Sequence, residues 1–511
     1  MIISLSVLVI TIIVSGTYAL YKAQLSKNIG VNTTTHGLAY YINYVKGTDI
    51  TAATLNPSTS YEGGASSDIE FWKKDDSYDI YGKIELTVNT IGTNLSNSPA
   101  LKYAVVNNGN VLKEGSLKGT TSGSKVTILK NLYLEQTKQI YTVYVWLDNS
   151  EELGNISNES LSISVDCTAS LQKEPTAADT IISLYTSAAK VTATNNSITY
   201  NTAPSVSLMN DRLGGTTTSL DGGNIRYYGA SPNNYIYFNC SDYSNQTSST
   251  CETWRIIGVF DGKLKLIRGS QIGTYSWDNK DTSTGAESNF GKNDWTTARL
   301  MKLLNPSDYY TTDSNDNNLG QGLYYNSASG KCYSGQNNAT VDCNFTSTGI
   351  KNDITRNMIA ETTYNLGGWN SNTVYPNLMY EKERGTTVYT GRPTTPWTGK
   401  IALAYTSDYG YAADLNQCKD KTLYDYNNST CTSNNWMKAI ITNNGSNTGW
   451  LLTPRSGSSS NAWYVNSGGF VSRDSIAYVA YGAVPVLSLS SELGIESGGD
   501  GSSSKPYKLS A

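Results

Sequence analysis

The spacing of the cysteines constrains this chain more than any other sequence feature. Six of the seven cysteines form three pairs that are close in sequence, and each pair brackets a polar stretch. A zinc site would show Cys-x-x-Cys pairs or neighbouring histidines, but the only histidine is His36. We therefore predict three structural disulfides, which place the chain in an oxidising compartment. The predicted pairs are Cys240 with Cys251, Cys332 with Cys343, and Cys418 with Cys431.

The seventh cysteine, Cys167, has no neighbour of this kind. Two interpretations stay open. It is either a buried free thiol at the end of a strand or one half of a disulfide to another chain.

Charge and composition exclude several classes of function. The net charge is -4 and 16% of the residues are charged, so there is no basic excess for nucleic-acid binding. With His36 as the one histidine, a Ser-His-Asp triad and a multi-histidine zinc site are nearly excluded. The 38 tyrosines and 45 glycines are typical of many short strands joined by polar turns, not of a helical bundle. We predict no catalytic residue, no metal site and no cofactor.

The first 21 residues predict membrane targeting. Residues 2–21 carry no charge, and their length is about that of a helix that spans a bilayer. One alternative is an uncleaved signal anchor, which would make the membrane a partner. The other is a signal peptide that is cleaved after Ala19. Both predict an N-terminal transmembrane or signal helix and the outer face of the cell membrane.

Residues 22–171 show the alternation of a half-buried sheet. Ile84, Leu86 and Val88 alternate with polar neighbours, and residues 140–147 repeat the pattern. This spacing predicts an all-β sandwich, either immunoglobulin-like or of jelly-roll type.

The leader and this segment together resemble camelysin/TasA-type exported proteins. The leader ends in Thr17-Tyr18-Ala19 and the β-rich module follows directly. The resemblance implies export, and it makes self-assembly into extracellular fibres an alternative expectation.

Residues 172–224 are predicted to be a linker with one short helix. Thr176 and Asp179 have the spacing of a capping box. Ile181, Leu184 and Ala188 follow at helical spacing, as in an amphipathic helix.

Residues 225–511 predict an α+β domain. Asp261-Gly262 joins two apolar runs, which is a strong signal for a β-hairpin. We also predict a helix that is capped by Asn293 or Asp294 and continues through Trp295.

Several motifs of this domain occur in one order that resembles a family of bacterial surface domains with a C-type-lectin-like fold. That fold is shared with the formylglycine-generating enzymes. The resemblance implies the fold but not the oxidase activity, because no reactive cysteine pair lies near the end of the chain. The matching segments are NYIYF at 234–238, WRIIG at 254–258, WTTARLMKLLN at 295–305, WLLTPRS at 450–456, NAWYVNSGG at 461–469, YGAVPVL at 481–487 and GGDGSSSKPY at 498–507.

These features favour a surface-displayed binding or adhesion protein whose lectin-like domain recognises an extracellular glycan or protein. Two alternatives are a structural subunit of an extracellular matrix or fibre, and an exported enzyme that uses carboxylates. Aromatic and basic side chains of the lectin-like segments are the candidate ligand contacts, with packing in the core as the alternative. These candidates are Trp450, Arg455, Trp463 and Tyr464.

Overall fold

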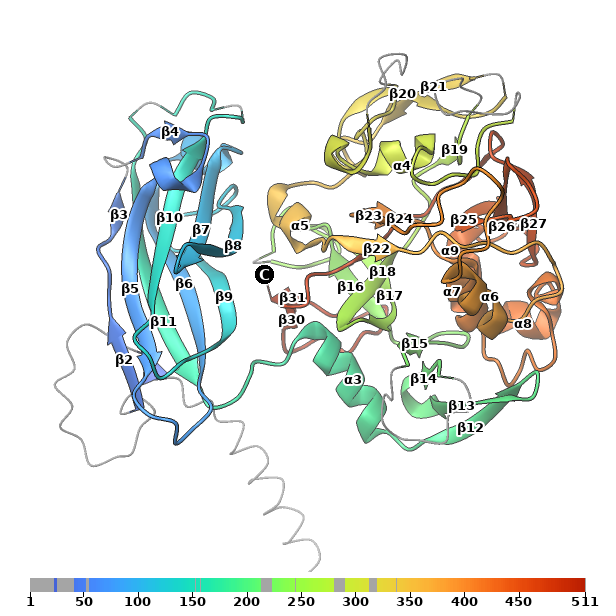
Figure 1. Ribbon diagram of the computed structural model, residues 1–511, viewed down its shortest axis with the longest axis horizontal. Helices are drawn as coiled ribbons and strands as arrows, with labels where there is room; N and C mark the ends of the chain where they lie inside the picture. Colours follow the sequence, from blue (N-terminus) through green and yellow to red (C-terminus); the bar gives the residue numbers. More distant parts are fainter. Residues whose placement is uncertain are drawn as a thin grey trace, which may run out of the picture. The chain divides into compact units, whose positions relative to one another are not determined.

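The chain forms two compact units, which meet in sequence between Glu174 and Pro175. This division comes from a computed structural model (Figure 1). The structure describes residues 23–24, 41–51, 55–151, 153–156, 158–212, 223–243, 245–279, 290–311, 319–336 and 338–510.

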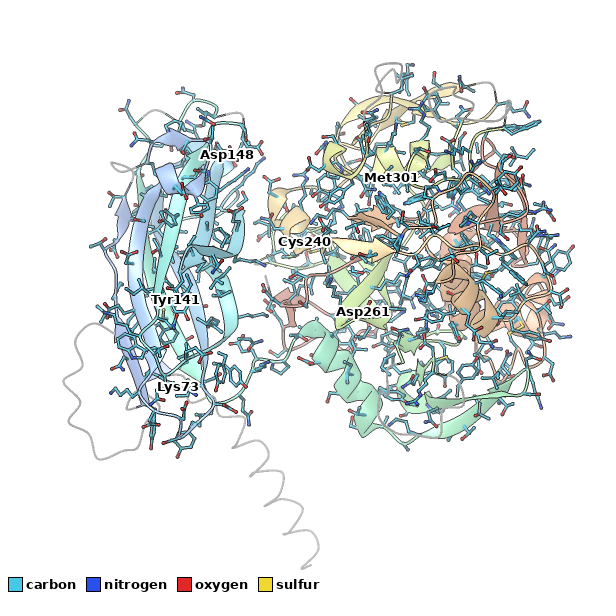
Figure 2. The ribbon with its side chains drawn as sticks, viewed as in Figure 1. Lys73, Tyr141, Asp148, Cys240, Asp261 and Met301 are labelled. Carbon is cyan, nitrogen blue, oxygen red and sulfur yellow. A yellow bond between two sulfur atoms is a disulfide. The ribbon has the colours of Figure 1, made fainter. Side chains whose placement is uncertain are left out.

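The first unit is a β-sandwich, as predicted. Ile84 and Leu86 of one sheet share a single buried core with Val143 and Val145 of the other. Tyr141 (labelled in Figure 2) begins the same alternation on β10. One sheet has the order β1-β11-β6-β9 with β3 on β11, and the second has the order β2-β5-β10-β7-β8 with β4 on β10. The first sheet contains β1 (Ala23–Gln24), β3 (Ile50–Thr51), β6 (Tyr81–Ile91), β9 (Lys125–Tyr133) and β11 (Leu161–Ser170). The second contains β2 (Ile42–Val45), β4 (Pro57–Ser58), β5 (Ala65–Lys73), β7 (Leu101–Asn107), β8 (Asn110–Ser116) and β10 (Ile140–Asp148), and α2 (Thr93–Asn97) connects β6 to β7.

The predicted N-terminal transmembrane helix is not supported. Among the described residues no helix is long and apolar enough to cross a bilayer. The longest of them, α3 (Ala177–Ser187), has 11 residues, which is about 16 Å of rise against a hydrocarbon core of about 30 Å. Residues 2–21, on which the prediction was based, lie outside the described residues.

The predicted α+β class with a C-type-lectin-like fold is wrong, because the described structure as a whole is mostly β-sheet, with 38% in strands and 15% in helices. The helices of the second unit have five to eleven residues, which is too short to form a layer of their own. They are α3, α4 (Arg299–Leu304), α5 (Asp353–Met358), α6 (Pro376–Glu383), α7 (Thr406–Tyr411), α8 (Ser429–Ser433) and α9 (Trp436–Ile441).

Two large sheets organise the second unit in the described part of the chain (Figure 1). The larger has the order β12-β13-β14-β15-β17-β18-β29-β24 with β16 on β17, and the smaller has the order β19-β28-β25-β26-β27. The larger sheet contains β12 (Val191–Asn195), β13 (Ile198–Ala203), β14 (Leu208–Asn210), β15 (Ile225–Tyr227), β16 (Tyr235–Phe238), β17 (Glu252–Phe260), β18 (Lys263–Arg268), β24 (Ile401–Ala402) and β29 (Val486–Ser488). The smaller contains β19 (Thr274–Ser276), β25 (Gly449–Pro454), β26 (Asn461–Val465), β27 (Val471–Ile476) and β28 (Ala480–Gly482). Three pairs complete the unit: β20 (Ser329–Tyr333) with β21 (Thr340–Asn344), β22 (Thr362–Tyr364) with β23 (Trp397–Gly399), and β30 (Gly494–Ile495) with β31 (Leu509–Ser510).

The helix predicted for residues 172–224 is present, but the segment is more than a linker. The capping box forms, because Thr176 Oγ1 accepts from the Asp179 backbone N–H and Asp179 accepts from that of Thr176. Strands β12, β13 and β14 then pair with one another, and β14 pairs with β15. Residues 191–210 therefore belong to the large sheet of the second unit.

Local turn signals were more reliable than helix boundaries. Asp261 and Gly262 form the predicted β17–β18 hairpin, and both have positive φ angles, of 48° and 70° (Asp261 is labelled in Figure 2). The helix expected from Asn293 onward begins only at Arg299 and has no side-chain cap. Residues 293–298 instead form an irregular segment.

The three predicted disulfides are present, and all of them lie in the second unit. Cys167, on β11 of the first unit, is a buried free thiol. Because the surrounding sheets cover its side chain, the alternative of a disulfide to another chain does not fit this structure. Burial also raises the pKa of the Cys167 thiol well above its ordinary value.

A buried ion network joins the large sheet to α7. Asp408 of α7 accepts from Arg226 Nη1 of β15 at 2.9 Å and also pairs with Lys265 of β18. Arg226 reaches Asp211 as well. The side chains of Arg226, Lys265 and Asp408 are at most 6% exposed. The attraction between the charges therefore has to offset the free energy that each one loses when it is removed from water.

The end of the chain returns to the beginning of the second unit. The Tyr237 backbone N–H donates to the Tyr507 carbonyl at 2.9 Å, and the Tyr507 N–H donates to the Tyr235 carbonyl at 2.9 Å. The Gln246 side chain bonds both the carbonyl and the N–H of Leu509, at 2.7 and 2.9 Å.

Candidate functional site

The two tryptophans that the sequence suggested as ligand contacts are core residues. Trp450 on β25 is 1% exposed, and its indole N–H donates to the Tyr275 carbonyl at 2.9 Å. Trp463 on β26 is fully buried, and its N–H donates to the Trp369 carbonyl at 3.3 Å. Both indoles are used inside the fold, so packing is their role.

Of the other two suggested residues, Tyr464 lies beside Trp450 and Arg455 does not. Tyr464 pairs with Trp450 across β25 and β26, and both rings pack against Tyr481, with centroids 5.5 and 4.7 Å away. The Arg455 guanidinium, one residue beyond β25, donates to Asp474 at 2.7 Å and to Asn370 at 2.8 Å. Because both tryptophans are buried, the four residues do not form an open site.

A recess in the second unit is the best candidate for a binding site. Its enclosed part measures about 10 Å³, which is room for about one water molecule, and it opens into about 310 Å³ of space that includes solvent. Its lining comes from five regions: the end of β19, the segment before α4, the stretch after β22, the loop between α6 and β23, and the end of β25. The lining residues are Trp277, Asn293, Asp294, Trp295, Leu366, Val388, Tyr389, Arg392, Pro393 and Pro454.

Trp295 is the most informative residue of the recess. It is 2% exposed, yet its indole N–H has no hydrogen-bond acceptor among the described residues. Its neighbours Trp277 and Trp397 lie 5.1 and 6.3 Å away between ring centroids. Their N–H groups donate to the carbonyls of Leu451 and Tyr309, at 3.0 and 3.1 Å. Of these three neighbouring indoles, Trp295 is thus the one whose donor has no acceptor among the described residues.

Asn293 fixes the wall of the recess. Its side-chain amide N–H groups donate to the carbonyls of Arg455, Ser458 and Asn461, at 3.0, 2.8 and 2.8 Å. Its side-chain oxygen accepts from Arg392 Nε at 3.0 Å. One amide therefore ties the segment before α4 to the β25–β26 connection and orients the arginine.

Two charged residues of opposite sign line the recess. Arg392 is half-buried and also donates to the Ser459 carbonyl. Asp294 accepts from the Thr296 backbone and hydroxyl at 3.1 and 2.7 Å, and its other oxygen lies 3.2 Å from Lys292 Nζ. The recess thus offers both donors and acceptors of hydrogen bonds.

The remaining lining is apolar or aromatic. Val388, Tyr389 and Pro393 come from the α6–β23 loop, and Leu366 and Pro454 come from β22 and β25 or their ends. Side chains of this kind exclude water from the polar groups between them, which strengthens every hydrogen bond made there.

The described residues offer no metal centre, since no three His, Cys, Asp or Glu side chains among them are placed to hold an ion. What the recess provides instead is a set of hydrogen-bonding groups between aromatic and apolar walls.

The sequence did not identify the recess, because Trp295 fits the helical spacing of the core residues that follow it. The segment runs into α4, which is marked by Met301 in Figure 2. The signal that was available is the pair Asn293-Asp294 immediately before a tryptophan. Asn and Asp side chains bond to nearby backbone groups and so compete with helix formation. The irregular segments that result often carry binding residues.

Comparisons with known proteins add no family. No protein-family profile matches the chain, and no characterised protein matches its sequence. Among solved structures, the crystal structure of an HCR/D mutant aligns over 51% of this chain and 75% of its own, with 12% identity and a TM-score of 0.14. A TM-score this low does not indicate a common fold.

Proposed function

We propose that this protein binds an acidic glycan outside the cell, through the recess lined by Trp295 and Arg392. The three disulfides indicate an extracellular or secreted protein. The recess supplies the recognition chemistry, and the sandwich unit is a separate module.

The unpaired indole N–H of Trp295 carries the proposal. A buried donor without an acceptor costs about 1–3 kcal/mol. Native structures keep few such groups, and each one calls for an explanation. An oxygen atom of a bound ligand would satisfy this N–H and recover that free energy.

Arg392 favours an acidic group on the ligand. Its guanidinium lines the recess and is oriented by Asn293, at 3.0 Å from Nε to the side-chain oxygen. Guanidinium groups bind carboxylates strongly because several N–H donors lie in one plane. A carboxylate would accept from both Arg392 and Trp295.

Asp294 and the walls favour a sugar as the rest of the ligand. The Asp294 carboxylate can accept hydroxyl groups, and the partly exposed Tyr389 and Pro393 can cover an apolar face of a ring at the mouth of the recess. Asp294 is the single carboxylate among the lining residues that the structure describes. Hydrolysis of a glycosidic bond generally uses a pair of carboxylates, so we propose binding without cleavage.

Calorimetric titration with methyl glucuronide and methyl glucoside tests this proposal, since the two ligands differ in one carboxylate. We expect the full chain to bind the glucuronide more tightly. Trp295→Phe removes the unpaired N–H and should weaken binding about tenfold, because one hydrogen bond to a charged acceptor is lost. Arg392→Gln should reduce the affinity for the glucuronide to that for the glucoside.

Trp450→Phe is the matched control. It removes an indole N–H that is already bonded to Tyr275, so it should lower the free energy of unfolding and leave the affinity unchanged. Trp295→Phe, by contrast, removes an N–H without an acceptor, so it should weaken binding without the loss of an internal hydrogen bond. Absence of binding to acidic glycans across a broad array, or equal affinity in Trp295→Phe and the wild type, would contradict the proposal.

A further inference from the structure

Two arginines next to the recess converge on the same two acceptors. Arg455 follows β25, and Arg473 lies on β27. Nε of each guanidinium donates to Asn370 Oδ1, at 2.8 Å from Arg455 and at 3.5 Å from Arg473. Both guanidinium groups also pair with the Asp474 carboxylate, Arg455 at 2.7 Å and Arg473 at 3.5 Å. Two positive charges are therefore held together by one amide and one carboxylate.

These contacts do not use all the donors of the two guanidinium groups. Nη2 of Arg455 and Nη2 of Arg473 have no acceptor among the described residues. The two side chains are 23% and 19% exposed, so both remain open to solvent. The Asp474 carboxylate neutralises only one of the two charges. The pair thus keeps a positive charge and planar N–H donors, which suit a carboxylate.

Trp369 and Lys382 add related chemistry next to the pair. Trp369 precedes Asn370 and forms a backbone bridge with Arg455. Its indole N–H has no acceptor among the described residues, as at Trp295. Lys382 Nζ of α6 lies 4.4 Å from the centroid of the Trp369 ring, and no carboxylate pairs with this amine in the part of the chain that the structure describes. Lys382 therefore adds an unpaired cation to the two arginines.

The arginine pair is continuous with the recess. Pro454 lines the recess, and Arg455 is the next residue. The Arg455 carbonyl accepts from the Asn293 side chain at 3.0 Å, and the same side chain orients Arg392 of the recess. Consecutive Cα atoms are about 3.8 Å apart, so a short oligosaccharide that fills the recess can also meet Arg455.

We propose that Arg455 and Arg473 form a second anion subsite beside the recess, and that the ligand is a glycan chain with a carboxylate on more than one sugar. This inference rests on the proposed function, since the recess would hold one acidic sugar and the arginine pair another. Asp474 competes with the ligand for the two guanidinium groups.

Calorimetric titration of the full chain with tetragalacturonate and with its fully methyl-esterified form tests the inference, because esterification removes the charges and keeps the length of the chain. Arg473→Gln should weaken the binding of tetragalacturonate about tenfold, since charge-assisted hydrogen bonds are lost. The affinity of this variant for methyl glucuronide should equal that of the wild type. Lys331→Gln is the matched control, because it removes one positive charge from the exposed pair with Asp342 on β20 and β21, and it should bind as the wild type does.

Asp474→Asn separates a binding role from a structural role. The amide keeps an oxygen that accepts from Arg455, but it no longer neutralises the pair. The affinity for tetragalacturonate should therefore rise about threefold, the size of one exposed ion pair. If the cluster only stabilised the fold, this variant would bind no more tightly than the wild type.

Equal affinity for tetragalacturonate in Arg473→Gln and the wild type would overturn the inference, as would Asp474→Asn binding no more tightly than the wild type. Methyl glucuronide separates the subsite from the proposed function. If methyl glucuronide binds and tetragalacturonate binds no more tightly, the subsite is refuted and the recess stands. If tetragalacturonate binds through Arg473 but Trp295→Phe has no effect, the proposed role of the recess is refuted and the subsite stands.

Discussion

At the scale of single residues, the second unit keeps charges in its interior by pairing them with one another. Asp408 faces Arg226 and Lys265 and also accepts from the Tyr405 backbone N–H at 3.0 Å. Burial acts to raise the pKa of Asp408, but the two cations outweigh it and hold the pKa below its ordinary value. Asp408 is therefore the carboxylate that the two cations share, while Arg226 also pairs with Asp211.

We expect Asp408→Asn to lower the free energy of unfolding by about 3–5 kcal/mol, because it leaves two buried cations without their shared partner. Urea unfolding at pH 7 measures this loss, with Asp342→Asn as the surface control. Since the folded-state pKa of Asp408 is depressed, its stabilising effect is present above the unfolded pKa of about 3.9 and is lost as the pH falls below it. The difference between wild type and variant should shrink in acid. An equal stability of the two proteins at pH 7 would contradict this account.

The sequence predicted some residues well and others not at all, for a physical reason. Cysteine pairing depends on spacing along the chain, so Cys240 and Cys251 were assigned correctly. The role of a tryptophan depends on which acceptor its N–H meets in three dimensions. The residues next to Trp450 and Trp295 in the sequence do not show which acceptor each indole meets. In the structure, Trp450 donates to a carbonyl, and Trp295 has no acceptor among the described residues.

At the scale of elements, β15 and β17 approach each other closely in the large sheet. The two strands pair through Ile225 with Val259 and through Arg226 with Gly258. A Cβ at Gly258 would lie 2.1 Å from the Ile225 carbonyl oxygen. Glycine is thus required here, because backbone approaches backbone.

Gly258→Ala should destabilise the second unit by about 1–3 kcal/mol, since β15 must move away and carries Arg226 with it. Thermal unfolding followed by near-ultraviolet circular dichroism measures the shift. Gly262→Asn is the matched control, because that turn position has a φ of 70° and no atoms within 4 Å of a Cβ, and asparagine tolerates this conformation. If both variants unfold at the wild-type temperature, β15 is not held as described.

Elements that are determined by residues close in the sequence were predictable, and those that depend on tertiary contacts were not. The Asp261-Gly262 hairpin and the Thr176 capping box are set by neighbouring residues, and both were predicted. The start of α4 was placed about five residues too early, because Asn293 and Asp294 bond to residues 455–461 and to Lys292 and Thr296 instead of capping a helix. Helix propensity gave way to tertiary contacts in a segment that lines the recess.

At the scale of the whole molecule, the two units differ in how they are stabilised. Every disulfide lies after residue 239, and the single cysteine of the first unit is a buried thiol. The alternation in residues 22–171 predicted the sandwich, whereas the class of the second unit was misjudged because its short helices do not form a layer. Capping residues in the sequence indicate where helices begin, but they do not show how long the helices are or whether they pack as a layer.

Reduction should therefore act on one unit only. Calorimetry of the full chain should show two transitions, and dithiothreitol should lower one of them, since each closed loop contributes about 3 kcal/mol. The other transition should stay at the same temperature, with Cys167→Ala as a control for the free thiol. A reductant that shifts both transitions equally, or neither, would contradict this assignment.

The return of the chain end to the start of the second unit has a consequence for biosynthesis. Gln246 meets its partner Leu509 only after a further 263 residues have been added, which takes roughly 13–50 s at ordinary rates of translation. During that time the backbone of Tyr235 and Tyr237 lacks its partner Tyr507, so this edge of β16 stays unpaired. We therefore expect the second unit to complete its folding only after synthesis of its last residues. Until then a chaperone would bind the incomplete unit, or the chain would be exported before it folds.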